Sequence, residues 1–437
     1  MGVRACVGPG GAVNQNARRL LELRDLWVAA KLGILALLSS LSMCHPLTYS
    51  KMKRRRAVVT GTLLGLVILG AAASDVRALD TPPMSWWGYW AGRKGDTKPG
   101  AKFLRRGEAR KFTSNIVLVH AGRDPGELAM LRRAFDSAHA HGRDVGVILM
   151  IDNVLRNIPN GIDASFLYYG AVEYDGWHQR LAQLSDALHA PGPDGWRPVD
   201  TIVAIAGFDE VNVYQSLLFN PVGDGPHPIP YAMELAQAYF PEVPDRGHVW
   251  KLGSDPTVDA PPNALTLEGS TLPFAYHYAA YAHPSNATTV PLCPHEGTFP
   301  AASLPSGSFA QQDESGLRDF VDAVNAVRGT TDTPVVFIPY SNIIGLTRNP
   351  IQSRGVGCSL EALWYHTRCL ASQGGSWATQ VRGFLAWQWA RSRPIVDGTT
   401  GELLDPGWPG TQRDRILQAS GKWIGRNLSF DPCEWTP

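Results

Sequence analysis

Short apolar runs that alternate with amphipathic segments constrain the fold of this chain more than any other feature. The run Ile202–Ala206 is apolar throughout, which is typical of a strand buried on both faces of a parallel sheet. Similar runs occur at 115–120 and 144–151. Between these two runs, Asp124 is a predicted N-cap and Pro125 occupies the first helical position. Strand, helix and strand joined by short connections indicate the βαβ units of a parallel sheet.

The rest of the chain extends this pattern. Further strands are predicted at 85–90, 334–340 and 383–389, and further helices at 168–189, 317–328, 360–372 and 413–426. Residues 92–101 are predicted to form a polar turn. The segments 221–230 and 241–305 are rich in Pro, Gly and polar residues, which predicts long loops with room for one or two strands between 245 and 280.

The number of strands and the chain length favour one class of fold. We predict an α/β protein, a (β/α)8 TIM-type barrel with long Pro/Gly-rich loops after strand 4. No Gly-x-Gly-x-x-Gly follows the first predicted strand, so an open dinucleotide-binding sheet loses its main support. The sequence therefore implies no cofactor.

The N-terminal region has the features of a targeting segment. A basic cluster at 51–56 precedes the apolar run 57–73, and Val76 and Ala78 supply the small residues of a cleavage site. This order is that of a secretory signal peptide, so we expect residues 52–78 to be removed on export. If cleavage failed, the apolar run could just span a bilayer as an anchor.

Residues 1–51 do not fit the signal-peptide pattern, because they hold a second apolar stretch and precede Met52. We expect translation to start at Met52 and residues 1–51 to be a non-native extension. Residues 79–437 are then expected to form a single (β/α)8-like domain. This domain is expected to be secreted or periplasmic, with no membrane association after signal cleavage.

The charge balance excludes one class of partner. The chain has 40 Lys and Arg and 39 Asp and Glu, but 11 of the basic and 3 of the acidic residues precede residue 79. That leaves 29 basic and 36 acidic residues, a formal charge of −7. Nucleic-acid binding needs clustered Lys and Arg against the phosphates, so an acidic exported domain is not expected to bind nucleic acid.

Four cysteines lie beyond residue 79, namely Cys293, Cys358, Cys369 and Cys433. In an exported protein, four cysteines predict two disulfides, with three possible pairings. None of them forms a C-x-x-C pair, so zinc ribbons and thioredoxin-type redox sites have no support. The position of Cys433 near the C-terminus predicts that one bridge ties the tail to the body.

Polar and aromatic residues follow the predicted strands, and in a barrel these positions converge on one face. They are Trp87, Trp90, His120, Asp152, Asn153, Asp209, Glu210, Asn212, Tyr340, Asn342, Trp387, Gln388 and Trp389. Aromatic faces stack on the apolar face of a pyranose, and carboxylates and amides pair with its hydroxyls, so the set suits a carbohydrate. Alternatively, Asp209 caps a following helix, Glu210 is a solvated first-turn residue and most of the Trp residues belong to the core.

The pattern resembles the superfamily of (β/α)8 glycoside hydrolases. In many of its families, the acid/base Glu ends the fourth strand beside an Asn or Asp, and a Trp on the last strand forms the floor of the sugar site. Phe208–Asn212 lies at the end of the fourth predicted strand, and Ala386–Trp389 ends the last one. The resemblance implies an exported glycoside hydrolase that cleaves a poly- or oligosaccharide by carboxylate acid/base catalysis.

The resemblance does not extend to the seventh strand. Such enzymes use two carboxyl groups, about 5–5.5 Å apart for retention or about 6.5–9.5 Å for inversion of the anomeric centre. In these families the second group is a Glu at the end of strand seven. Here the strand at 334–340 is followed by Ser341 and Asn342. The second carboxylate must therefore come from elsewhere in the chain.

The resemblance implies that Glu210 is the general acid, with its pKa raised by a dry aromatic pocket and nearby carboxylates. The second carboxylate is then Asp152 or Asp209, or a loop residue such as Glu268 or Glu296. Asp152 is the better candidate, because Asp209 should point away from Glu210 in an extended segment.

Two other interpretations remain. His120 with Asp152 and a carboxylate after the fourth strand could hold a divalent ion, but no His-x-His or His-x-x-x-His occurs among the strand-end residues, so no metal site is predicted. A non-catalytic glycan-binding barrel would keep the aromatic residues and lack one carboxylate. The separation of two carboxyl groups across a cleft distinguishes this alternative from an enzyme.

Overall fold

The computed structural model describes residues 83–91, 97–111, 113–143, 145–155, 174–212, 226–252, 260–277, 304, 308–339, 350–374, 377–387, 395–396, 403–405, 412–426 and 433. Residues 80–437 belong to one compact unit, and this unit is described below. Residues 1–79 lie outside the described residues, so the predicted extension and signal peptide stay predictions.

Within the described residues, nine strands form one parallel sheet in the order β5-β4-β3-β2-β1-β9-β8-β7-β6. Their bounds are β1 Trp86–Trp90, β2 Ile116–His120, β3 Gly146–Met150, β4 Ile202–Ala206, β5 Asp245–Gly247, β6 Val249–Leu252, β7 Phe274–His277, β8 Val335–Pro339 and β9 Val381–Trp387. Two short segments, β10 (Ile395–Val396) and β11 (Leu403–Asp405), pair antiparallel outside this sheet.

The two ends of this sheet, β5 and β6, are halves of one strand, because only His248 separates them. On one side, Gly207 donates its backbone N–H to Gly247 at 2.8 Å, and Val249 donates to Phe208 at 2.9 Å. On the other side, β6 pairs with β7. The nine strands thus occupy the eight positions of a barrel, which confirms the predicted (β/α)8 TIM-type fold.

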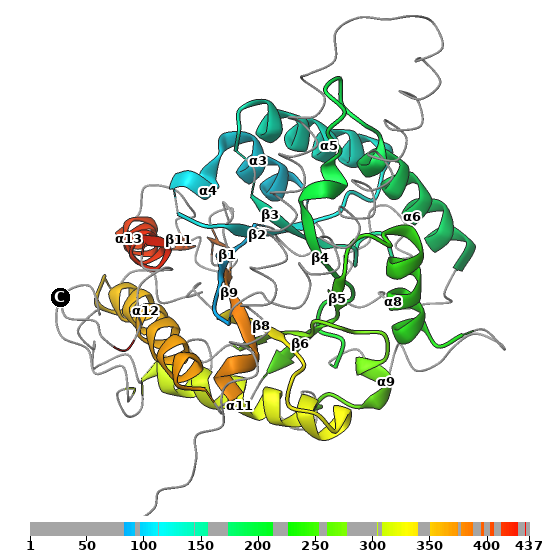
Figure 1. Cartoon of the computed structure of the whole chain (residues 1–437). Helices are drawn as coiled ribbons and strands as arrows, with labels where there is room; N and C mark the ends of the chain where they lie inside the picture. The colour runs from blue at the N-terminus through cyan, green and yellow to red at the C-terminus, as the bar shows by residue number, and fades with distance from the viewer. Residues whose placement is uncertain are drawn as a thin grey trace, which may run out of the picture. The chain divides into compact units, whose positions relative to one another are not determined.

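The helices surround the strands (Figure 1). Their bounds are α3 Lys98–Arg106, α4 Glu108–Lys111, α5 Pro125–Ala140, α6 Tyr174–His189, α8 Pro228–Tyr239, α9 Ala264–Leu267, α11 Phe309–Arg328, α12 Pro350–Gln373 and α13 Gln412–Arg426, with 3₁₀ turns η2 at Pro198–Thr201 and η5 at Trp377–Gln380. Helix α5 begins as predicted, since the Asp124 carboxylate accepts the backbone N–H of Glu127 at 2.8 Å. In the described part of the chain, no helix has the length and hydropathy needed to cross a bilayer.

Alternate strand residues divide the core into two layers. Inward-facing side chains of the strands, from Trp90 and Ile116 to Tyr276 and Leu385, fill the barrel interior. Outward-facing strand residues such as Trp87 pack with the apolar faces of the helices. This division follows from the twofold alternation along a strand, and it decides which residues can reach the carboxyl end of the barrel.

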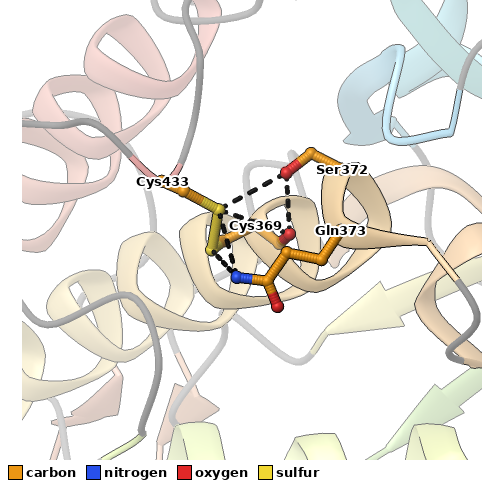
Figure 2. The surroundings of a disulfide bond; sticks show 4 residues. All are labelled: Cys369, Ser372, Gln373 and Cys433. Carbon is orange, nitrogen blue, oxygen red and sulfur yellow. Dashed lines mark hydrogen bonds between the residues drawn. A yellow bond between two sulfur atoms is a disulfide. The ribbon is translucent and has the colours of Figure 1, made fainter. Parts of the chain in front are cut away.

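A disulfide joins Cys369 on α12 to Cys433 near the C-terminus, with a Cα–Cα distance of 5.0 Å. Ser372 and Gln373 on the same helix lie against it, with the Ser372 hydroxyl 3.4 Å from the Cys433 sulfur (Figure 2). The bridge confirms the prediction that Cys433 is tied to the body. Cys358 is also disulfide-bonded, and its partner and Cys293 lie outside the described residues.

Several elements differ from the sequence prediction. One or two strands are expected between 245 and 280, and two positions of the barrel are filled there, by the interrupted strand β5–β6 and by β7. Helix α3 begins at Lys98, inside the predicted turn, and α8 begins at Pro228, inside a segment predicted as loop. In both helices proline occupies the first turn, where its missing N–H has no intrahelical partner to lose.

Candidate active site at the carboxyl end of the barrel

The loop after β4 is hydrogen-bonded to the neighbouring strand β6. Val249 donates its N–H to the Phe208 carbonyl, and Val211 donates to the Val249 carbonyl, both at 2.9 Å. Two residues of the loop thus lie opposite a single residue of β6, which is the arrangement of a bulge. The loop has a fixed backbone at the end of the barrel where active sites of this fold lie.

Glu210 is the second residue of this bulge and has a left-handed backbone, with φ of 52°. A positive φ is strained for a residue with a side chain, and such strain is concentrated at functional sites. The segment is therefore not extended at Glu210, so the argument from an extended segment against Asp209 as the second carboxylate does not apply. Asp209 itself is buried.

A buried histidine forms a hydrogen bond with the backbone at the start of the bulge. His248, in the break between β5 and β6, accepts the N–H of Phe208 at its Nδ1 (3.0 Å), and its Nε2 lies 3.1 Å from the Ile229 carbonyl. Only the neutral ring with hydrogen on Nε2 satisfies both bonds. Complete burial lowers the pKa of His248 to about 4, although its bond to the Ile229 carbonyl raises the pKa. Gly207 permits this approach, since a Cβ there would lie 2.6 Å from the His248 ring.

Tyr276 connects the bulge to β7, the strand on the far side of the interrupted strand β5–β6. It lies on β7, faces the barrel interior and donates its hydroxyl to a carboxylate oxygen of Glu210. This bond joins side chains that are 66 residues apart in sequence. A phenol donor stabilises the ionised carboxylate and fixes its direction.

A second hydrogen-bonded group lies at the ends of β1 to β3. The indole of Trp90 donates to Nε2 of His120 at 3.1 Å, and Nδ1 of His120 lies 3.1 Å from Oδ1 of Asp152. An indole N–H can only donate, so Nε2 must accept and Nδ1 must carry the hydrogen that Asp152 receives. All three side chains are buried, with Trp90 2% exposed, His120 0% and Asp152 1%.

The remaining predicted residues have different positions. Trp87 is on the outer face of β1, packed edge-on against Tyr89. Asn153 donates to the Ala121 carbonyl at 3.3 Å, next to the second hydrogen-bonded group. Asn212 exchanges two hydrogen bonds with the backbone of Lys251, at 2.7 and 2.9 Å, and so extends the pairing of the loop with β6.

Several predicted site residues are not placed by the structure. Tyr340, Asn342, Gln388 and Trp389 lie outside the described residues. Trp387 ends β9 with its backbone in register with Trp90, but its side chain also lies outside the described part. Their roles stay predictions.

The described residues contain no group of three or more His, Cys, Asp or Glu side chains arranged to hold a metal ion. Sequence reasoning missed Tyr276 and His248. Tyr276 could have been found from the alternation in Phe274–His277, because Phe274 and Tyr276 share one strand face. Nothing in the sequence around His248 distinguishes it from a surface histidine.

No protein-family model matches the sequence, and no curated protein matches it. Solved structures with a similar chain path include a glycoside hydrolase family 5 mannosidase from Rhizomucor miehei, with TM-score 0.43, 10% identity and coverage of 80% of this chain and 95% of that chain. An endo-β-1,4-mannanase from Thermotoga petrophila has TM-score 0.42, 10% identity and coverage of 80% and 79%. An endoglucanase from Pseudomonas stutzeri has TM-score 0.39, 12% identity and coverage of 80% and 96%. These barrels are glycoside hydrolases, and the likeness concerns the fold alone.

Proposed function

We propose that this protein is an exported glycoside hydrolase that cleaves a poly- or oligosaccharide at the carboxyl end of its barrel, with Glu210 as the central carboxylate. The observation that carries the proposal is the state of Glu210. Its backbone is strained, its side chain accepts a hydrogen bond from Tyr276 on β7, and it is only partly buried. A carboxylate fixed in this way at the functional end of a barrel suits acid/base work on a bound ligand.

In the proposed reaction, Glu210 protonates the glycosidic oxygen as the bond to the anomeric carbon breaks. The hydrogen bond from Tyr276 fixes the direction of the carboxyl group toward that oxygen. The aromatic residues Trp387 and Trp389 provide the surface on which the sugar stacks.

The second carboxylate is Asp152 or Asp209, which acts as base or stabilises the oxocarbenium-like transition state. Both are buried near the strand ends, and Asp152 also receives the hydrogen of His120. Comparing Asp152→Asn with Asp209→Asn in the presence of azide separates them. Azide should restore product formation only in the variant that lacks the reacting carboxylate.

We propose export because residues 52–78 have the sequence of a signal peptide. The disulfide between Cys369 and Cys433 supports this proposal, since such bonds persist in oxidising compartments. N-terminal sequencing of the mature protein tests this part of the proposal. A mature N-terminus near residue 79 would support export by signal cleavage, and a product that retains residues 1–51 would contradict it.

The first test of the function is product release from a panel of polysaccharides by the purified protein, with Glu210→Gln measured beside it. We expect release by the wild type and a loss of about three orders of magnitude or more in kcat for the variant, with ligand affinity nearly unchanged. Retention of more than about a tenth of the activity would remove Glu210 from this role. If neither protein releases product but one glycan raises the melting temperature of both, the barrel is a binding protein and the catalytic proposal is wrong.

A further inference from the structure

A cavity of about 400 Å³ lies at the amino end of the barrel, the end opposite to Glu210. Its wall includes Arg110, Ser114, Asn115, Arg143 and Gly425. These residues come from the segments that lead into β2 and β3 and from the last turn of α13. The cavity is therefore separate from the candidate active site.

Two arginines in the cavity wall bind neutral acceptors among the described residues. Arg110 donates to the Gly142 carbonyl at 2.6 Å, and Arg143 donates to the Arg105 carbonyl at 2.7 Å. Both acceptors are neutral, and among the described residues neither guanidinium forms an ion pair with a carboxylate. A guanidinium has five N–H donors, so each arginine keeps donors for a ligand.

Ser114 adds a third donor. Its hydroxyl is buried in the cavity wall and has no hydrogen-bond partner among the described residues. A buried hydroxyl without a partner costs free energy, so a ligand that accepts from it would remove a penalty already present in the folded protein.

The backbone around these donors is held rigidly. Asn115 accepts the N–H of Trp87 at 2.9 Å and donates to the Ser85 carbonyl at 2.7 Å, which joins the starts of β1 and β2. Thr113, also in the wall, has a positive φ of 51° and donates its hydroxyl to Gly421 on α13 at 2.8 Å. A β-branched residue in this conformation is a backbone outlier that the surrounding structure must hold in place.

The charge at this cavity contrasts with the charge of the domain. Residues 79–437 have a formal charge of −7, yet none of the described residues of the cavity wall is acidic. The exposed Arg105 and Arg106 adjoin the wall in sequence, as does one acidic residue, Glu108. A local excess of positive charge on an acidic protein complements an anion.

We infer that this cavity binds a tetrahedral oxyanion, the phosphate or sulfate group of a free ion or of a larger molecule. Two guanidinium groups and a hydroxyl offer donors from two separate segments of the chain, those that lead into β2 and β3. The amide of Asn115 and the hydroxyl hydrogen of Thr113 are already used within the protein. The two guanidinium groups only donate and Ser114 can donate, which fits a multiply charged acceptor better than a sugar hydroxyl or a cation.

The test is a titration of the full-length protein with inorganic phosphate at constant ionic strength, followed by ³¹P NMR. We expect saturable binding in the millimolar range or tighter, with sulfate competing for the same site. Arg110→Gln and Arg143→Gln should each weaken binding roughly tenfold, and Ser114→Ala roughly threefold. Arg133→Gln is the matched control, because Arg133 is an exposed arginine of α5 outside the cavity wall, and it should stay within about twofold of the wild type.

Three results would overturn the inference. They are the absence of saturable binding up to about 20 mM phosphate, an equal loss of affinity in Arg133→Gln and Arg110→Gln, and acetate binding as tightly as phosphate. If Arg110→Gln does not fold, Arg110→Lys replaces it, since it keeps the charge but loses the planar donor set and should still weaken binding. A second titration uses glycerol 3-phosphate in place of inorganic phosphate, and the two affinities are compared. Tighter binding than inorganic phosphate identifies a phosphate carried on a larger molecule, and weaker binding identifies the free ion.

Discussion

Two hydrogen-bonded groups meet at the carboxyl end of this barrel, and they differ in how they are held. Trp90, His120 and Asp152 come from three neighbouring strands, are fully buried and have a single consistent direction of donation. Glu210 follows β4 and Tyr276 lies on β7, the two strands that flank the interrupted strand β5–β6, and Glu210 has a strained backbone.

This difference in burial, pairing and backbone strain predicts different roles for the two groups. A buried group whose donors and acceptors are paired with one another stabilises the fold and fixes the strand ends. A partly buried carboxylate held against its backbone preference costs stability, and such a cost persists where it serves function. We therefore expect substitutions of Trp90 and His120 to change mainly stability and substitutions in the second group to change mainly activity. Substitution of Asp152 should lower stability whether or not it is the second carboxylate.

The largest expected effect is on stability, from Asp152→Ala. This change leaves the Nδ1 hydrogen of His120 buried without its acceptor, which should lower the free energy of unfolding by about 3 kcal/mol. Asp152→Asn keeps an acceptor oxygen and should cost only about 1 kcal/mol. Urea unfolding followed by circular dichroism measures both, and equal losses in the two variants would show that the bond to His120 does not set the cost.

The next effect concerns pH and the support beneath Glu210. Burial lowers the pKa of His248 to about 4 in the folded protein. In the unfolded chain the same residue takes up a proton near pH 6.5, so between these pH values only the unfolded state is protonated at this position. The free energy of unfolding should therefore fall as the pH drops from about 6.5 to about 4, by up to roughly 3 kcal/mol from this residue. In His248→Gln the pH dependence over this window should be reduced by that amount. An unchanged slope would place the source of acid sensitivity elsewhere.

An intermediate effect is expected for Tyr276→Phe. Loss of the phenol removes a donor that fixes Glu210 and stabilises its ionised form, so kcat should fall about tenfold and the alkaline limb of the pH–rate profile should move to higher pH. Tyr231→Phe is the control, since its hydroxyl binds His178 on the outer helices at 2.7 Å. A lower kcat without movement of the alkaline limb would mean that Tyr276 only positions the carboxylate.

The smallest effect has the opposite sign. Glu210→Gly should raise the free energy of unfolding by about 1 kcal/mol, because glycine adopts a φ of 52° without strain. The same variant should be inactive. Asp209→Gly serves as the comparison, because Asp209 does not have a positive φ and should be destabilised by the change. Thermal unfolding of both variants would show whether the strain at Glu210 is real.

The long apolar strands of this barrel could be predicted because their sequences are apolar on both faces, as in Ile202–Ala206. For the interrupted strand β5–β6, the sequence predicts only the interval 245–280 and not the bounds. Its first half, Asp245–Gly247, has two charged residues and a glycine, and its pairing depends on β4, which is remote in sequence. Helix α8 was missed because its first turn contains Pro228 and Pro230, which also mark loops.

The sequence predicts where the candidate-site residues lie relative to the strands, but not which of their side chains are in contact. Glu210 could be placed at the end of β4 from the sequence, because the strand ends where its apolar run ends. Its left-handed backbone could not, since that depends on hydrogen bonds to Val249 across the strand break. The contact with Tyr276 requires the register of β4 and β7 on either side of the interrupted strand, which no local pattern encodes.

The disulfide between Cys369 and Cys433 has a consequence for the order of events during synthesis. The first strand, β1, pairs with the last, β9, so the barrel wall stays open until residues 381–387 have been made. The bridge encloses that last strand and needs a cysteine only four residues from the C-terminus. Oxidation of this pair can thus occur only after the strand that closes the barrel wall has been made. A product truncated at its end would have every strand of the barrel and still lack the bond that retains the final one.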